Sequence, residues 1–283
     1  MQNLTFYKWR IVFLSLVWVS FLCRCDSLPE KPSYLDYDPN NPEYKKPEVT
    51  IVFPQNDEVI ASDSVTLIWE GNTSGMTYSY KLDSNPYSTF TTQKSANFRD
   101  LPDGMHYFSV YGKYPTGFTS TSDFCRFLIW NYNGPGLIFY PAEISQPATW
   151  AFYIQLLVID TTPINSVYCK IHYNSTELEA TTIDFYGDDK GFLLKNGGYL
   201  VNSADIDSTQ GQVLLQTQVF DGTPPDVAGS GRIAELRFRH LQGDTVQVEI
   251  SPDSYFMTSG GAQIPLTLIQ GTTLIATTKE GIP

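Results

Sequence analysis

The side chains that most often carry out catalysis or hold metal ions are few in this sequence and lie far apart. The three histidines, His106, His172 and His240, each stand alone within a segment typical of a strand. No two histidines have the His-x-x-His spacing, and no two cysteines have the Cys-x-x-Cys spacing, with which a short segment binds zinc. We therefore expect structural or surface histidines and no zinc site.

Acidic residues are plentiful, but their arrangement does not indicate a reaction. Glycoside hydrolysis needs two carboxylates across a cleft, and no acidic residue lies in a catalytic motif of that kind. Two clusters carry the oxygen ligands that calcium prefers, without the EF-hand order that ends in Glu. These clusters are Asp184 with Asp188 and Asp189, and Asp205 with Asp207. We favour solvated turns, so we expect no catalytic activity, and calcium is the one cofactor left open.

The first 25 residues have the pattern of an export signal. Lys8 and Arg10 precede an apolar run from Ile11 to Leu22, which ends at Cys23, Arg24 and Cys25. A run of this length is too short to cross a bilayer about 30 Å thick as a permanent helix. We predict a cleaved signal peptide over residues 1–25, and the alternative is an uncleaved N-terminal anchor.

A cysteine that closes an apolar run resembles the signal of bacterial lipoproteins, in which that cysteine becomes the acylated first residue. Cys25 is the favoured lipidation residue, and Cys23 is the second choice. Arg24 and Leu22 stand before them, where such signals usually have a small residue. The alternative is cleavage by an ordinary signal peptidase. The resemblance implies an exported bacterial protein that is anchored to a membrane by an N-terminal lipid, at the outer surface or in the periplasm.

Residues 26–47 form a Pro-rich tether, DSLPEKPSYLDYDPNNPEYKKP, without apolar periodicity. Proline fixes φ and favours extended conformations in the residue before it. We therefore predict a semi-rigid, polyproline-like spacer that would lift the folded part of the chain away from a membrane.

The remaining chain has the size and composition of two all-β domains. The full chain of 283 residues exceeds one ordinary domain of about 100 to 150 residues. Hydrophobic residues make up 42%, aromatic residues 14% and charged residues only 17%, as is typical of globular β proteins. The net charge is −12, and clustered basic residues are missing, which argues against nucleic acid as a partner.

Residues 48–131 contain about seven short segments of alternating hydrophobicity, which predict an antiparallel β-sandwich of immunoglobulin type. The segment resembles bacterial fibronectin type III-like or immunoglobulin-like modules. The resemblance lies in a W-x-G step at Trp69–Gly71, a Y-x-Y-x-L-D strand at Tyr78–Asp83, and an L-x-D-G-x-H-x-F-x-V strand at Leu101–Val110.

Aromatic residues of this domain allow two interpretations. Trp69, Tyr78, Tyr80 and Tyr87 could form a platform on which a sugar stacks, but aromatic rings in strands usually fill the core. We favour the core for Trp69 and keep Tyr87, which lies on a turn, as a candidate ligand contact.

The two cysteines that follow the signal fall in different predicted domains. A disulfide requires Cα atoms within about 7 Å of each other. We therefore expect Cys125 and Cys169 to be buried free thiols, with a disulfide as the alternative.

Residues 132–283 contain nine segments with strand character, a number that suits a jelly roll. Their order resembles the cohesin domain from beginning to end. One cohesin motif, Y-[DN]-x-x-x-L-x-[AV], matches Tyr173, Asn174, Leu178 and Ala180. A second and stronger one, G-[ST]-G-x-[LIV]-A-x-[LIV]-x-F, matches Gly229, Ser230, Gly231, Ile233, Ala234, Leu236 and Phe238.

The second motif contains an interruption of the two-residue period. We expect Ile233, Leu236 and Phe238 to face the core. Regular alternation would separate Ile233 from the other two, so either a bulge lies near Ala234 or Ile233 lies on the outer face. We expect the charged residues Arg232, Glu235, Arg237 and Arg239 to meet solvent or the other sheet.

The cohesin resemblance implies a nine-stranded jelly roll whose flat outer sheet binds a dockerin, a small calcium-loaded helical module, in polysaccharide-degrading assemblies. The chain itself has no dockerin-like calcium loops and no attached hydrolase. The partner could be a dockerin-bearing protein, another surface protein in an adhesion assembly, or a polysaccharide, and fold analogy does not choose among them.

Overall fold

The computed structural model describes Leu35 and residues 37–187, 191–220 and 226–277. The predicted signal peptide, with Cys23 and Cys25, lies outside the described residues, as do Asp188 and Asp189 of the first acidic cluster. Within the described ranges, no helix has the length and apolar character that crossing a bilayer requires. The chain divides into two units, residues 1–46 and 47–283.

The described part of the first unit differs from the extended spacer that its prolines predict. The backbone N–H of Asn41 donates to the carbonyl oxygen of Asp38, and that of Tyr44 to Asn41, both at 2.9 Å. The side chains of Asp38 and Asn41 also accept hydrogen bonds from the backbone two residues further along. Asp and Asn stabilise turns in this way, so residues 38–44 form consecutive turns instead of a polyproline helix.

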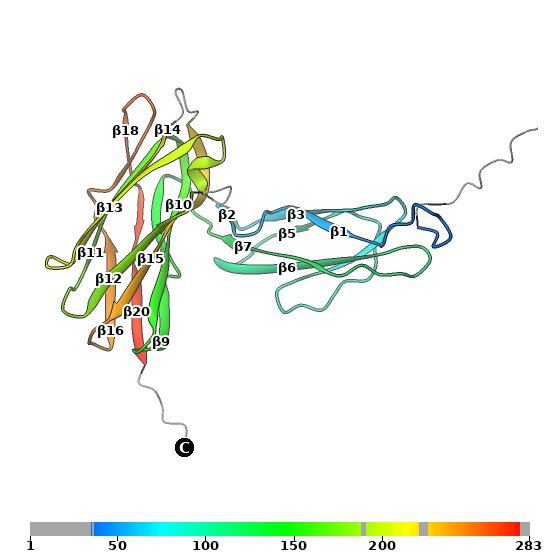
Figure 1. Cartoon of the computed structure of the whole chain (residues 1–283), viewed down its shortest axis with the longest axis horizontal. Helices are drawn as coiled ribbons and strands as arrows, with labels where there is room; N and C mark the ends of the chain where they lie inside the picture. Colours follow the sequence, from blue (N-terminus) through cyan, green and yellow to red (C-terminus); the bar gives the residue numbers. More distant parts are fainter. Residues whose placement is uncertain (1–34, 36, 188–190, 221–225, 278–283) are drawn as a thin grey trace, which may run out of the picture. The chain divides into compact units, whose positions relative to one another are not determined.

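The second unit begins with a sandwich of seven strands, the number that the sequence predicts (Figure 1). Its two sheets have the strand orders β1-β3-β5 and β2-β7-β6-β4. The strands are β1 (Val49–Phe53), β2 (Glu58–Ile60), β3 (Val65–Gly71), β4 (Thr77–Leu82), β5 (Ser95–Phe98), β6 (Gly104–Lys113) and β7 (Asp123–Ile129).

Aromatic rings fill the space between these two sheets. Trp69 and Phe108 are fully buried, with ring centroids 5.7 Å apart, and Tyr78 is buried beside them. The interpretation of Trp69 as a core residue is confirmed. The four-ring sugar platform is wrong, because the rings of Trp69 and Tyr78 are buried in the core and cannot meet a ligand.

A buried histidine joins the ends of β4 and β6. The Nδ1 atom of His106 lies 2.8 Å from a carboxylate oxygen of Asp83, and its Nε2 atom lies 2.9 Å from the carbonyl oxygen of Pro102. The other carboxylate oxygen of Asp83 accepts the backbone N–H of Tyr107 at 2.8 Å. His106 therefore has a structural role, as the sequence predicts.

Residues 136–277 form a second and larger sandwich. Its sheets have the orders β12-β15-β10-β8-β19 and β13-β14-β11-β16-β20-β9, and the latter also includes β17 and β18. We call them the five-stranded and the eight-stranded sheet. The elements are β8 (Gly136–Tyr140), β9 (Glu143–Pro147), β10 (Ala151–Ile164), β11 (Ser166–Tyr173), β12 (Leu178–Phe185), η1 (Phe192–Leu194), β13 (Tyr199–Asp207), β14 (Gln212–Phe220), β15 (Val227–His240), β16 (Thr245–Ile250), β17 (Tyr255–Met257), β18 (Gln263–Pro265), β19 (Leu268–Gln270) and β20 (Thr272–Thr277).

The described residues of this sandwich form thirteen strands, from β8 to β20, where the sequence predicts nine. Each predicted segment contains a strand, and the first one is divided into β8 and β9 around Pro141. The strands β18 and β19 are only three residues long. Together with the division of the first segment, β18 and β19 account for three of the four additional strands. The fourth is β13, which is exposed along most of its length and lacks an alternating apolar pattern. The predicted all-β sandwich fold is confirmed.

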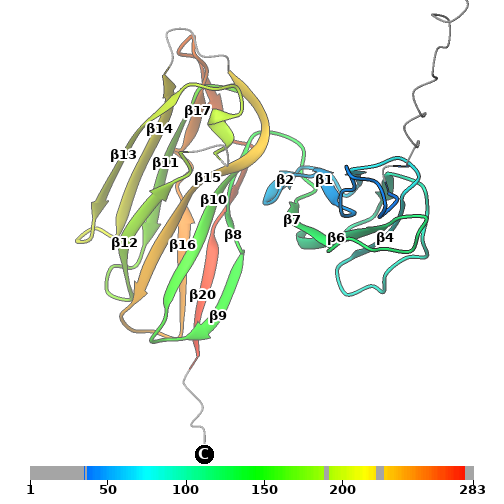
Figure 2. The same ribbon diagram turned by 45° about the vertical axis from the view of Figure 1, so that its right-hand side comes forward.

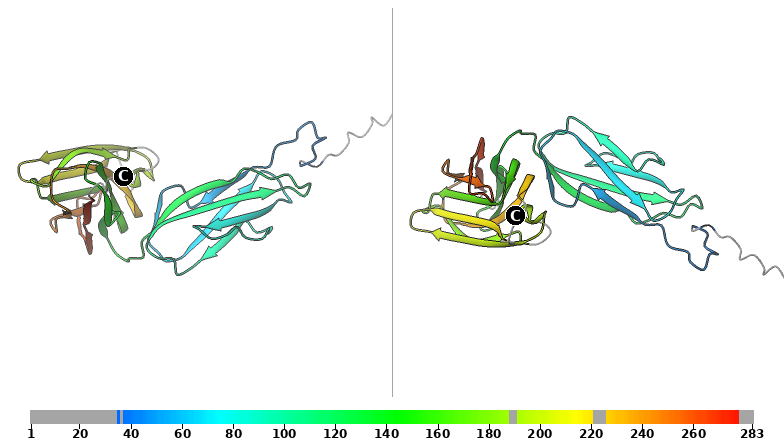
Figure 3. Two further views of the ribbon diagram at one scale, coloured as in Figure 1. Left: turned by 90° about the horizontal axis from the view of Figure 1, so that it is seen from below. Right: turned by 90° about the horizontal axis from the view of Figure 1, so that it is seen from above.

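One hydrophobic core lies between the two sheets of the second sandwich; Figure 3 shows the chain along the strand direction of this sandwich. Phe139, Phe152 and Ile154 contribute from the five-stranded sheet, and Val213 and Leu215 from the eight-stranded sheet. All five side chains are fully buried.

A β-bulge lies at Ile233 in β15. Arg232 pairs with Leu157 of β10 and Ala234 pairs with Leu156, so Ile233 has no partner in β10. Ile233 is buried in the same core as Leu236. The predicted bulge is confirmed, and the alternative, Ile233 on the outer face, is wrong.

Arg232 differs from its prediction, because it is buried against residues of the first sandwich. It forms an ion pair with the carboxylate of Asp57 and donates to the Asp57 carbonyl oxygen at 3.2 Å. Burial lowers the pKa of the Arg232 guanidinium to about 10, so the group stays charged at neutral pH. A buried cation needs a nearby counter-ion, and Asp57, which also pairs with the exposed Arg126, supplies it.

An apolar cluster accompanies this ion pair. Ile138, Leu157 and Ile159 of the five-stranded sheet contact Val59 and Leu128 of the first sandwich, and all five are buried. Burial of such side chains is worth about 1.5–3 kcal/mol each. The two sandwiches of the second unit are therefore held together by apolar packing and by the ion pair between Arg232 and Asp57.

Removal of the counter-ion tests this description. We expect Asp57→Ala to lower the free energy of unfolding by about 3–5 kcal/mol, because it leaves the Arg232 charge buried without a partner. The double variant Asp57→Ala/Arg232→Met should recover most of that loss in urea unfolding. The exposed Asp253→Ala serves as the control; an equal effect of Asp253→Ala and Asp57→Ala would contradict the role of the ion pair.

The thiols provide a second test. Cys125 and Cys169 are buried and free, as predicted, and burial raises the pKa of each thiol to about 12. In a Cys23→Ser/Cys25→Ser background, neither should react with a thiol reagent at pH 8 until the protein is unfolded in guanidinium. Since unfolded thiols ionise near pH 9.0, these groups should lower the stability as pH rises from about 9 to about 12. Rapid labelling of the native protein would contradict their burial.

Candidate binding surface

The outer face of the eight-stranded sheet is set by the alternation of β14. Val213, Leu215, Thr217 and Val219 point into the core and are buried. Successive side chains of a strand point to opposite faces, so the residues between them must point away from the core. These outward residues are Leu214, Gln216, Gln218 and Phe220.

The edge strand β13 adds apolar side chains to the same face. Tyr199 lies opposite Phe220, with ring centroids 5.7 Å apart, and Val201 lies opposite Gln218. The exposed fractions are 56% for Tyr199, 54% for Val201, 37% for Leu214 and 52% for Phe220. We call these four residues the apolar strip.

Polar and charged residues continue the outer face beyond the strip. Tyr168 of β11 stacks on Tyr255 of β17 with ring centroids 4.7 Å apart. Lys170 and His172 alternate with Tyr168 along β11, and Gln247 and Glu249 lie on β16. Figure 2 shows β13, β14 and β11 side by side in this sheet. The face is thus an apolar strip bordered by amides, charges and one ring pair.

A shallow hollow lies between the strip and β11. It is lined by Tyr168, Lys170, Asp205, Asp207, Gln212, Val213 and Leu214. Hydrogen bonds from the Thr209 hydroxyl and from the backbone N–H of Gln210 lower the pKa of Asp207, so this carboxylate remains charged. The hollow combines the carboxylates of Asp205 and Asp207 with the Lys170 ammonium and can receive polar groups of a ligand.

The acidic cluster at Asp205 and Asp207 is not the loop that the calcium alternative assumes. Asp205 lies within β13, and Asp207 ends that strand and accepts hydrogen bonds from the turn after it. Across the described ranges, no three His, Cys, Asp or Glu side chains are placed to share a metal ion.

The first cohesin-like motif lies where β11 turns toward β12. Tyr173 is buried against Phe238, with ring centroids 5.4 Å apart. Asn174 accepts a hydrogen bond from the Leu178 backbone at 2.9 Å through its carbonyl oxygen. The Asn174 side chain accepts another from the Thr176 hydroxyl at 2.9 Å. Leu178 and Ala180 then enter the core, so the motif shapes a turn beneath the sheet and does not reach the outer face.

The second cohesin-like motif forms most of β15. Gly231 has no room for a side chain, because a Cβ atom there would lie 2.8 Å from Cβ of Phe192 in η1. Gly229 has a φ of 103°, a conformation that favours glycine. Ala234, Leu236 and Phe238 are buried in the core. These residues position the five-stranded sheet and make no contribution to the exposed surface.

Tyr87 lies on the first sandwich, on the loop between β4 and β5. Its ring contacts Tyr111 at 5.0 Å between centroids, and its hydroxyl lies 2.9 Å from the hydroxyl oxygen of Ser109. The ring remains partly exposed. Tyr87 therefore belongs to the outer face of β4 and β6 and is remote in sequence and sheet from the apolar strip.

Sequence reasoning missed the strip. Leu214 and Phe220 lie in a segment predicted as a strand, and its two-residue period could have identified them as outward residues. Tyr199 and Val201 had no such signal, because β13 carries apolar and polar residues without alternation.

The turn at Tyr173 provides a test of how the sheet is positioned. Gly211 has a φ of 63°, and a Cβ atom on it would lie 2.0 Å from the Tyr173 carbonyl oxygen. We expect Gly211→Ala to lower the free energy of unfolding by more than about 2 kcal/mol through overpacking and strain. Gly260→Ala is the matched control, since its nearest neighbour would be at 3.7 Å. Equal melting temperatures for the two variants would contradict this packing.

About half of the chain is similar in fold to solved cohesin domains. A non-cellulosomal cohesin from the archaeon Archaeoglobus fulgidus matches with a TM-score of 0.40 and 13% identity, over 52% of this chain and 94% of that one. The seventh ScaB type I cohesin from Pseudobacteroides cellulosolvens matches with a TM-score of 0.41 and 11% identity, over 54% of this chain and 97% of that one. No protein-family model and no curated protein matches the sequence.

Proposed function

We propose that the protein is a non-catalytic binding protein and that the outer face of its eight-stranded sheet binds a protein partner. The observation that carries this proposal is the apolar strip, which exposes the paired rings of Tyr199 and Phe220 beside Val201, with Leu214 further along β14 opposite Asp205. Exposed apolar side chains with a polar surround are typical of the centre of protein interfaces. Interfaces of this kind depend on a few large anchors, and Tyr199 and Phe220 fit that role.

The composition of the strip favours a protein over a glycan. A sugar stacks on rings that present a flat surface, whereas Tyr199 and Phe220 are inclined by 53° to each other. Val201 and Leu214 complete the strip with aliphatic side chains, which pack well against apolar protein side chains. The amides of Gln216 and Gln218, which lie between Leu214 and Phe220 on β14, can pair with backbone groups of a partner.

The first partner to test is a dockerin-type module. The resemblance of residues 132–283 to cohesins supports it, and so does the position of the strip on an open sheet face. In this proposal the chain is exported, is held at a bacterial membrane through a lipid on Cys25, and presents its sheet to a partner in a polysaccharide-degrading or adhesion assembly.

Polysaccharide binding by the first sandwich is a second candidate function, and one observation favours it. Tyr107 and Phe124 are exposed on the outer face of β6 and β7, and their ring planes are inclined by only 21° with centroids 6.1 Å apart. These two stacked and exposed rings provide an aromatic surface on which a sugar chain can pack. Tyr87 lies on the same sheet and could extend that surface.

Capture of partners by the full-length protein tests the leading function. We expect it to retain dockerin-bearing proteins in calcium and to release them in EDTA, because a dockerin folds around calcium. Tyr199→Ala and Phe220→Ala should each weaken binding of the captured protein by at least about tenfold, as loss of an interface anchor does.

The matched control is Tyr107→Ala, which removes an exposed ring of similar size from the first sandwich. It should leave capture unchanged. Capture that survives both strip substitutions, or retention of the protein on a polysaccharide gel without any protein partner, would contradict the proposal.

A further inference from the structure

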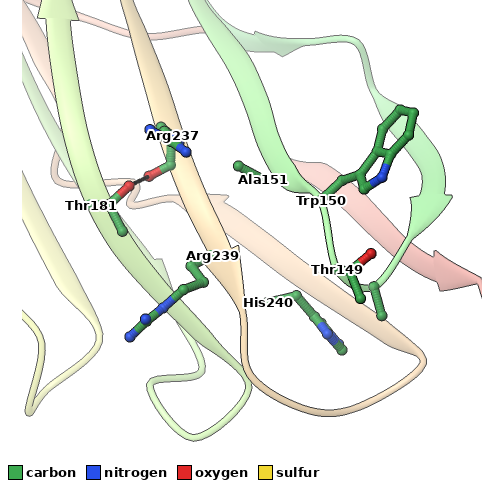
Figure 4. A pocket seen from close by; sticks show the side chains of 8 residues that line it. Thr149, Trp150, Ala151, Thr181, Arg237, Arg239 and His240 are labelled. Atoms are coloured by element: carbon green, nitrogen blue, oxygen red, sulfur yellow. Dashed lines mark hydrogen bonds between the residues drawn. The ribbon is translucent and has the colours of Figure 1, made fainter.

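A pocket lies at one end of the five-stranded sheet, on the face that points away from the core. Figure 4 shows Trp150 on the turn before β10 and the two arginines on β15. The lining residues are Ala148, Thr149, Trp150, Ala151, Thr181, Arg237, Arg239 and His240. This pocket belongs to a different sheet from the apolar strip, so it is independent of the function proposed above.

Strand register explains why this place is hollow. Ala151 of β10 lies opposite Arg239 of β15, and Tyr153 lies opposite Arg237. Ala148 and Ala151 have side chains of a single carbon, which leave the space beside Trp150 unfilled. Because side chains of β15 alternate between the two faces of the sheet, Phe238 points into the core and Arg237 and Arg239 point outward. The two guanidinium groups therefore line the pocket on the outer face of the sheet, and the apolar core lies on the other face.

The two arginines differ in how their charges are compensated. Arg239 forms an ion pair with Glu179 of β12. The guanidinium of Arg237 lies 5.5 Å from the ring centroid of Tyr153, and no carboxylate in the described part of the chain pairs with it. A planar guanidinium held over a ring presents two N–H groups in the geometry that a carboxylate accepts. Arg237 is therefore the group that can receive an anion.

The indole of Trp150 forms the opposite side of the pocket. Its exposed fraction is 63%, the highest among the large hydrophobic residues that the structure describes. An aromatic face in the open offers a large apolar surface on which the C–H groups of a sugar ring can pack. The Thr149 hydroxyl can pair with a sugar hydroxyl, and the Thr181 hydroxyl, which donates to the Arg237 carbonyl oxygen at 3.1 Å, can still accept one. His240 also lines the pocket, but its Nε2 atom lies 2.6 Å from the Gly243 carbonyl oxygen.

We propose that this pocket binds a short acidic saccharide, with a sugar carboxylate on Arg237 and a pyranose face on Trp150. The combination favours a sugar over an acidic peptide, because Trp150 supplies a stacking surface and the hydroxyls of Thr149 and Thr181 can pair with sugar hydroxyls. The net charge of −12 repels long polyanions, so the pocket suits a chain end or a short oligosaccharide.

Calorimetric titration of the full-length protein with trigalacturonate tests the proposal, and the fully methyl-esterified trisaccharide is the uncharged match. We expect the acid to bind about ten- to a hundredfold more tightly than the ester, as for a charge-assisted hydrogen bond. Arg237→Gln should remove this preference without weakening the binding of the ester. Trp150→Ala should weaken both ligands by a similar factor.

Two control variants separate this site from the other surfaces. Arg99→Gln removes an exposed arginine of the first sandwich, and Tyr199→Ala removes an anchor of the apolar strip. Both should bind trigalacturonate as the wild type does. Since Trp150 and Arg237 are exposed, their variants should keep the wild-type melting temperature, which shows that any loss is local.

Three results would overturn the proposal. The first is a preference for the acid that persists in Arg237→Gln. The second is binding of triglutamate as tight as that of trigalacturonate, which would assign the pocket to acidic peptides. The third is the absence of binding to trigalacturonate and to a hyaluronan tetrasaccharide alike. Loss of protein capture in Tyr199→Ala alone would leave the pocket unaffected and would bear only on the protein-binding function.

Discussion

The second sandwich depends on one extra residue in one strand, the bulge at Ile233. In a regular strand, Arg232 would share a face with Ala234, Leu236 and Phe238, and a charge would enter the apolar core. The bulge shifts the phase of β15 by one residue, so Arg232 points away from the core together with Arg237 and Arg239. The burial of Ile233 in the core and the ion pair of Arg232 with Asp57 both follow from this shift.

The three arginines show how one strand face can carry charges in three different states. Arg232 is buried and neutralised by Asp57, and Arg239 is paired with Glu179 at the surface. The guanidinium of Arg237 lies over the ring of Tyr153, and its N–H groups are available to a ligand. The charges of Arg232 and Arg239 are compensated within the protein. The charge of Arg237 is therefore the one that can attract an anion to this end of the acidic molecule.

The sequence was sufficient for the parts of the structure that burial dictates. Alternating apolar residues predict the strands that form both cores, and the broken alternation around Ala234 predicts either a bulge or an outward Ile233, of which the structure has the bulge. The sequence does not predict the features that depend on contacts between residues far apart in the chain. The charge of Arg232 is compensated by Asp57, which lies 175 positions away in the sequence, so no local sequence pattern indicates this pair. The strand β13 is held by its backbone pairing with β14, so its side chains carry little information about its conformation.

The position of β20 has a consequence for how the sandwich forms. This strand pairs with β16 on one side and in parallel with β9 on the other, so that Thr273 lies opposite Glu143. Until β20 is in place, β9 has no neighbour in its sheet. The sheet therefore closes only when a late segment of the chain inserts between two earlier ones, and such distant pairing slows folding. During synthesis, the edge of β16 and the whole of β9 stay open to other chains until the last strand arrives.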